Sequence, residues 1–108
     1  MTHFSQGDIV SFSYDPTKGH EPQDHRPSVV VSNDEYQRMT SLVVVCPITR
    51  TDSGYPLHFK LPEDCVVEGA ICVEQLRSVD LIARKAEVIG SLDKATLAKV
   101  SNAAKLFF

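Results

Sequence analysis

The most chemically versatile segment of the sequence is a polar stretch near the N-terminus, Asp15–Arg26. Its twelve residues include two histidines, one arginine, one lysine and three acids. Histidine titrates near neutral pH and can transfer protons, and an arginine guanidinium holds phosphate oxygens in a fixed two-pronged geometry. The composition therefore permits acid–base chemistry on a phosphate ester. A solvated loop without a chemical role has the same composition, so both interpretations stay open at this point.

Short strands are predicted on both sides of this segment, and they would hold its two ends. Asp8–Tyr14 alternates apolar and polar residues, and Pro27–Ser32 and Leu42–Thr49 contain valine runs typical of central strands. Twelve residues is long for a connection between strands, and long loops in compact domains are often functional. Pro27 biases Arg26 toward an extended backbone, which would fix the base of its side chain where the second strand begins.

Later segments predict further strands. Tyr55–Leu61 alternates, and the polar link Arg50–Gly54 before it favours a hairpin with the preceding strand. His58 and Lys60 would then lie on the outer face of that hairpin. The other expected elements are strands at Gly69–Leu76 and Lys85–Ile89 and one irregular helical turn at Asn33–Ser41.

The C-terminal segment changes to a helical period. Asp93 is a good N-cap for a helix running to about Leu106, and Leu92 and Leu97 would form a hydrophobic staple. One apolar stripe follows at three- and four-residue spacing: Leu97, Val100, Ala104 and Phe107. We therefore expect a mainly β fold, a small bent sheet or barrel capped by this helix, as a single domain over residues 1–108.

Composition restricts the class of protein. A net charge of -3 and a pI of about 5.7 argue against a general nucleic-acid coat, which would be basic, but leave room for a local phosphate-binding cleft. Because no apolar run approaches the roughly 20 residues of a membrane span, and the N-terminus lacks a secretory signal pattern, we expect a cytoplasmic protein without membrane contact. Three cysteines without a Cys-x-x-Cys pattern should be reduced thiols, mostly buried. Beyond His20 and His25 no ligand pair has metal-site spacing, so we expect neither a metal nor a cofactor.

Six short segments, specific in their order and spacing, span nearly the whole chain. They are Gly7–Val10, Asp15–Glu21, His25–Ser32, Val45–Thr49, Gly54–Pro56 and Glu74–Asp80. Each one alone is a weak signal. Together they make the chain resemble the MazF/PemK (Kid-like) family of toxins from type II toxin–antitoxin systems.

The resemblance implies a fold, an activity and partners. The fold would be an SH3-like (CcdB/PemK-type) small barrel with a C-terminal helix, forming a homodimer. The activity would be that of an mRNA interferase, a metal-independent and ribosome-independent endoribonuclease that cuts single-stranded RNA at specific sequences and is inhibited by a cognate antitoxin. Cleavage in this family uses the ribose 2′-OH as nucleophile, leaving a 2′,3′-cyclic phosphate (or its opened 3′-phosphate) and a 5′-OH. Because DNA lacks this hydroxyl, selectivity for RNA needs no further device at the chemical step.

Positions matching the family's catalytic pair are Arg26 and Thr49. The guanidinium would stabilise charge on the phosphate oxygens, often the largest catalytic contribution, and the threonine hydroxyl can donate to the same oxygens. His20 and Glu21 are further catalytic candidates. The candidates for RNA binding are Lys18, His25, Arg50, Glu74, Gln75 and Arg77. A purely structural role is an equal alternative for Glu21, His25, Gln75 and Arg77.

Some relatives use a second catalytic arrangement, with a histidine in the first loop and an arginine and an acid on a later strand. His20 matches the histidine and Glu74 matches the acid. The arginine position is occupied by Cys72. This departure favours the assignment to Arg26 and Thr49.

Two other functions fit the same fold. A CcdB-like gyrase inhibitor acts through a C-terminal helix ending in tryptophan, glycine and isoleucine, whereas this chain has no tryptophan and ends in Phe107-Phe108. A non-catalytic SH3-like binding module has no evident use for both Arg26 and Thr49, but Cys72 keeps this alternative open.

Overall fold

The structure is a computed structural model that describes residues 3–13, 25–50 and 54–107. Within these ranges, seven antiparallel strands form one sheet in the order β4-β5-β3-β2-β1-β7, and β6 also pairs with β3. The strands are β1 (Asp8–Ser13), β2 (His25–Val30), β3 (Val43–Thr49), β4 (His58–Lys60), β5 (Ala70–Cys72), β6 (Arg77–Val79) and β7 (Glu87–Ser91). The helical elements are α1 (Asp34–Thr40), α2 (Lys94–Ala104) and the short 3-10 turns η3 (Val73–Gln75) and η4 (Lys105–Phe107).

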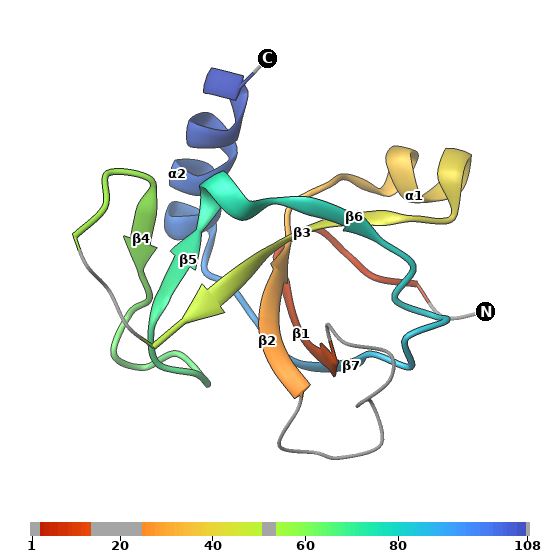
Figure 1. Cartoon of the computed structure of the whole chain (residues 1–108), viewed down its shortest axis with the longest axis horizontal. Coiled ribbons are helices and arrows are strands. Elements are labelled where there is room, and N and C mark those ends of the chain that lie inside the picture. The colour runs from red at the N-terminus through yellow and green to blue at the C-terminus, as the bar shows by residue number, and fades with distance from the viewer. Residues whose placement is uncertain (1–2, 14–24, 51–53, 108) are drawn as a thin grey trace.

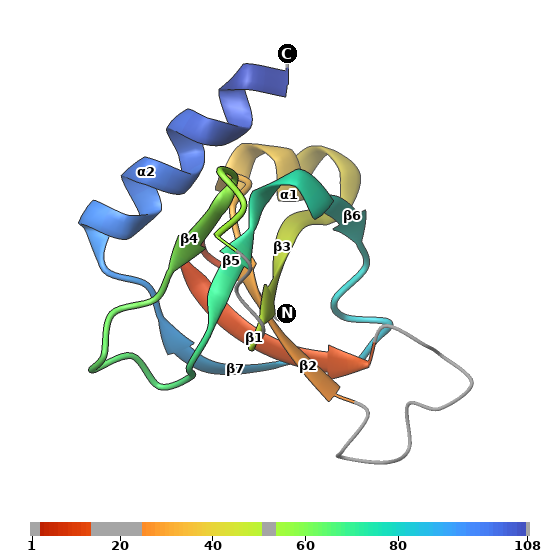
Figure 2. The same ribbon diagram turned by 60° about the vertical axis from the view of Figure 1, so that its left-hand side comes forward.

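The sheet is strongly bent, so that both faces of its central strands are buried (Figure 1). Successive residues such as Val29 and Val30 belong to two different core clusters. One cluster includes Val100 and Ala103 of α2, and the other is completed by residues such as Leu81. A strand that is buried on both faces reads as a continuous apolar run. The valine runs therefore predicted the central strands correctly, and the mainly β fold with a C-terminal helix is confirmed (Figure 2).

Helix α2 begins as its sequence predicts. The Asp93 carboxylate accepts a hydrogen bond from the Thr96 amide at 2.9 Å. Hydrogen bonding with the Thr96 side chain, and then with this amide, holds the pKa of Asp93 below its usual value. Leu92 and Leu97, the predicted staple, both pack in the core cluster that α2 covers. The predicted apolar stripe is wrong at its end, because Phe107 lies in η4 and is 39% exposed.

The predicted hairpin between β3 and Tyr55–Leu61 is wrong. Strand β5 lies between them and pairs with both, and β4 contains three residues, His58–Lys60. Asn33–Ser41 also differs from the single irregular turn expected, because Asn33 caps a regular seven-residue helix, α1. No helix within the described ranges combines the length and the apolar character that a membrane span requires.

Gly69 brings the start of β5 against the end of β3. Its φ of +134° is unfavourable for residues with a side chain, and a Cβ added there would lie 2.2 Å from the carbonyl oxygen of Thr49. That oxygen belongs to the backbone and cannot rotate away. Gly54 also has a positive φ, +76°, but a Cβ there would meet nothing within 4 Å.

We predict that Gly69→Ala destabilises the protein far more than Gly54→Ala does. The Gly54 variant should cost about 1–2 kcal/mol of unfolding free energy for its left-handed backbone, and the Gly69 variant at least about 3 kcal/mol, since strain and a backbone clash combine. Urea denaturation of both variants measures the difference. Equal losses would contradict the close approach of Gly69 to Thr49.

Candidate functional site

A cleft opens where β2 and β3 separate. Their hydrogen-bonded ladder ends at Ser28 and Pro47, and Pro27 precedes it on β2. Neither proline has an amide hydrogen to donate to a ladder. The last two residues of β3 still pair with β5, which lies on the other edge of this strand. Arg26 and Thr49, which would face each other had the ladder continued, both line the cleft.

The cleft has a volume of about 1020 Å³ and brings together residues from both halves of the bent sheet. Six of the predicted site residues line it: His25, Arg26, Thr49, Arg50, Gln75 and Arg77. They come from β2, the end of β3, η3 and β6, which are distant in sequence. Glu74 is not among the lining residues but bonds to one of them, His58. Lys18, His20 and Glu21 lie outside the described residues, so their predicted roles stay predictions.

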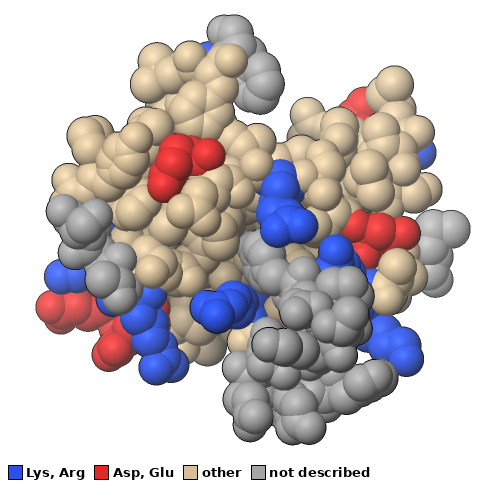
Figure 3. Space-filling view, in the orientation of Figure 1, with Lys and Arg blue, Asp and Glu red and all other residues tan. Residues whose placement is uncertain are grey.

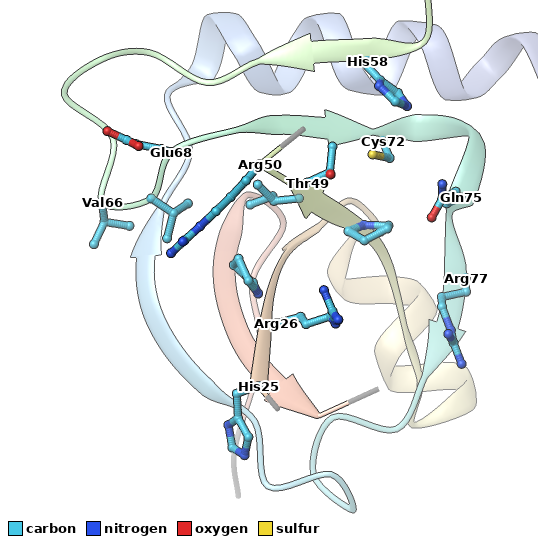
Figure 4. Close-up of a pocket in the computed structure, with 14 residues that line it drawn as sticks. His25, Arg26, Thr49, Arg50, His58, Val66, Glu68, Cys72, Gln75 and Arg77 are labelled. Atoms are coloured by element: carbon cyan, nitrogen blue, oxygen red, sulfur yellow. The ribbon is translucent and has the colours of Figure 1, made fainter. Parts of the chain in front are cut away.

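Positive charge dominates the cleft although the chain as a whole is acidic. Arg26, Arg50 and Arg77 line it together with one carboxylate, Glu68. Several Lys and Arg side chains lie near the middle of the face shown in Figure 3. In the close-up of Figure 4, Arg26 points into the middle of the cleft, with Arg77 and Gln75 to one side. Three guanidinium groups around one hollow suit a ligand with phosphate groups.

His58 was predicted to lie on an outer strand face, and this prediction is wrong. Its side chain is only 10% exposed, and its Nε2 lies 3.0 Å from Oε2 of Glu74. The Tyr55 ring lies beside it, with ring centroids 5.3 Å apart. Burial alone would raise the pKa of Glu74, but the hydrogen bond with His58, the His58 charge and further hydrogen bonds from the backbone and Gln75 together lower it. Glu74 is therefore an ionised carboxylate at one end of the cleft.

The cysteines differ in their surroundings. Burial, together with the neighbouring Cys72 and Glu74, raises the pKa of Cys46 to about 12, so this thiol is unsuited to act as a nucleophile. Cys72 is also buried but lines the cleft. Among the His, Cys, Asp and Glu side chains of the described ranges, those close enough to share a metal ion are His58, Cys72 and Glu74, with ligand atoms within 4.8 Å of one another.

Sequence comparison relates the chain to toxins. Residues 5–108 match the family described as PemK-like, MazF-like toxin of type II toxin-antitoxin system. The endoribonuclease toxin MazF of Escherichia coli (strain K12) is 34% identical over 86 residues, which cover 80% of this chain and 77% of that protein. The endoribonuclease toxin ChpB of the same strain is 36% identical over 97 residues, covering 82% and 80% respectively.

Structural comparison agrees. The crystal structure of MazF (Form-I) from Deinococcus radiodurans superposes with a TM-score of 0.84 at 30% identity, covering 99% of this chain and 97% of that one. A MazE-MazF structure (Form-II) from the same organism gives the same TM-score at 28% identity, covering 99% and 96%. The predicted SH3-like barrel is thereby confirmed. A family match over nearly the whole chain, together with these relatives, shows that this protein belongs to the PemK-like, MazF-like toxins of type II toxin–antitoxin systems.

Proposed function

We propose that the protein is an endoribonuclease that cleaves single-stranded RNA at specific sequences, independently of the ribosome, in the cytoplasm. Relatives that are at least 34% identical, MazF and ChpB, are named endoribonuclease toxins. The observation that carries the proposal is the position of Arg26, which points into a cleft lined also by Thr49 and two further arginines (Figure 4).

In the proposed reaction the ribose 2′-OH attacks the adjacent phosphorus and the bond to the 5′-oxygen of the next nucleotide breaks. The products are a 2′,3′-cyclic phosphate and a 5′-OH. Arg26 binds the non-bridging phosphate oxygens, whose negative charge increases in the transition state. Thr49 donates its hydroxyl to the same group from the opposite wall. Arg50, Arg77 and Gln75 hold neighbouring phosphates or bases, which fixes the reacting geometry.

The proposal favours cleavage over simple binding because of where the groups lie. A binding module needs positive charge along the path of the RNA backbone, and Arg50 and Arg77 at the sides of the cleft suffice for that. Arg26 and Thr49 instead line the same cleft from two strands whose ladder has ended. A guanidinium and a hydroxyl that both donate to one phosphate would support catalysis.

Arg26→Ala should reduce cleavage of a single-stranded RNA by about 100- to 1000-fold, the usual loss when one such donor is removed. Arg26 is exposed, so its truncation leaves no buried cavity and the melting temperature should stay near that of the wild type. Arg26→Lys should also fail, because a point charge does not replace a two-pronged donor. Gel analysis of RNA fragments measures all three rates. Cleavage by Arg26→Ala at the wild-type rate would place the active site elsewhere.

Companion substitutions separate the two catalytic arrangements. Thr49→Ala should reduce the rate less than Arg26→Ala does, and Thr49→Ser should retain part of the activity because the hydroxyl remains. His20→Ala, in the loop outside the described residues, should be close to wild type. Complete loss with His20→Ala would support the histidine-centred arrangement instead.

We predict that EDTA leaves RNA cleavage intact. Arginine side chains can provide the positive charge at the phosphate that a divalent ion provides in metal-dependent nucleases. The measurement is the cleavage rate in buffer with and without the chelator. Loss of activity on chelation, followed by recovery with Mg²⁺, would contradict the metal-independent mechanism.

We also propose that the protein is a homodimer inhibited by a cognate antitoxin with an acidic, partly disordered segment. Symmetric dimers are the commonest assembly, and a cleft that binds phosphates also attracts carboxylates. Sedimentation of the protein alone at micromolar concentration should give twice the mass of the chain. Sedimentation together with the protein encoded beside it should give a heavier complex that no longer cleaves RNA. A monomer would contradict the proposed homodimer. Full RNA cleavage in a saturated complex would contradict inhibition by the antitoxin.

A further inference from the structure

Three side chains of the kinds that bind transition metals meet at one end of the cleft. His58 on β4 is directly opposite Cys72 on β5 in the antiparallel register, so both side chains leave the sheet on the same face. Glu74 follows in η3 and reaches back to His58, with Nε2 and Oε2 3.0 Å apart. The three ligand atoms lie within 4.8 Å of one another.

The surroundings of this cluster favour a bound cation. The side chains of His58 and Glu74 are 10% and 23% exposed, and Cys72 is almost completely buried. Oε1 of Glu74 is buried and accepts no hydrogen bond within the described part of the chain, an arrangement that costs free energy unless a partner is supplied. A divalent ion with one thiolate, one carboxylate and one neutral imidazole forms a site without net charge, which suits a poorly solvated position.

We propose that His58, Cys72 and Glu74 bind a Zn²⁺ ion. Zinc in proteins takes sulfur, nitrogen and carboxylate ligands at about 2.0–2.3 Å in tetrahedral geometry, which separates ligand atoms by roughly 3.3–3.8 Å. Ion binding would shorten separations in the cluster that now reach up to 4.8 Å and would slightly lengthen the 3.0 Å between Nε2 of His58 and Oε2 of Glu74. The Cys72 thiol loses its proton to solvent on binding, and His58 binds as the neutral imidazole.

The fourth position of the ion faces the cleft, because His58 and Cys72 both line it. Three protein ligands leave that position open to water or to an oxygen of another molecule. An ion there occupies the end of the cleft that Gln75 also lines. If the proposed RNA cleavage is correct, Zn²⁺ inhibits it, because the ion competes for phosphate oxygens that Arg26 and Thr49 must hold. The ion is thus an inhibitor and takes no part in the reaction.

Cobalt titration of the reduced, metal-free protein tests the site without reference to activity. Co²⁺ should produce the intense absorption of a thiolate-bound tetrahedral ion at one equivalent per chain, and Zn²⁺ should displace it. Cys72→Ser should abolish the thiolate band. This substitution should also weaken Zn²⁺ binding by more than about 100-fold, since even outer-shell changes cost 10- to 100-fold. Cys65→Ser is the matched control, because Cys65 is half-buried and lies outside the cluster; it should bind like the wild type.

Glu74→Gln gives a second test in case Cys72→Ser fails to fold, as circular dichroism would show. It should keep a thiolate band but bind Zn²⁺ more weakly. Absence of the band in wild-type protein, or equal binding by Cys72→Ser and wild type, would overturn the proposed site.

The inhibition is measured separately. Zn²⁺ should slow RNA cleavage by the wild type, EDTA should restore it, and Cys72→Ser should resist Zn²⁺ when compared with its own metal-free rate. Metal binding without any RNA cleavage would refute the proposed function and leave the zinc site standing. RNA cleavage without metal binding would refute the zinc site and leave the proposed function standing.

Discussion

Strand β3 changes its hydrogen-bonding partners along its length, and the cleft depends on that change. Its first residues pair with β2 and β6, whereas Ile48 and Thr49 pair with β5. Strands β2 and β5 lie on opposite edges of β3. Among the described residues, the ladder on the β2 edge stops at Pro47 while the β5 edge stays paired to Thr49, and the cleft opens on the β2 edge. Pro27 and Pro47, which have no hydrogen to donate, lie at the point of separation.

The cleft has a local charge opposite to that of the whole molecule. The chain carries a formal charge of -3, yet three arginines surround the hollow. At physiological salt, charges more than about 8–10 Å apart are largely screened. A phosphate close to the cleft is therefore affected mainly by Arg26, Arg50 and Arg77, while the remaining surface offers RNA little attraction. Such an arrangement favours binding at one place over accumulation along the nucleic acid.

The sequence was informative where the physical cause is local. The Asp93 cap and the alternation of Val10 and Phe12 in β1 were predicted correctly, because each depends on neighbouring residues. The strand that pairs with β4 was predicted wrongly. Proximity in sequence favoured β3, but β5 lies between β3 and β4 in the sheet. His58 was missed for the same reason: its carboxylate partner is sixteen residues away and reaches it only through the β4–β5 pairing.

The candidate site likewise depends on contacts between residues that are distant in sequence. Arg26 and Thr49 were identified by resemblance, and no local pattern could have placed them on facing walls. Their approach depends on the register between β2 and β3 and on its interruption. The sequence likewise does not predict that His58 lies near Cys72 and Glu74, because the pairing of β4 with β5 brings them together.

The tight approach of Gly69 to Thr49 also has a genetic consequence. Any missense change in a glycine codon introduces a side chain, and every side chain begins with the Cβ that would collide with the Thr49 carbonyl. A cell population that expresses this toxin without its antitoxin selects for inactivating mutations. Survivors of such a selection should carry changes at Gly69 of many chemical kinds, large and small, whereas at Gly54 small residues should remain toxic. The spectrum of escape mutants would thus show where the backbone beside the cleft tolerates no side chain.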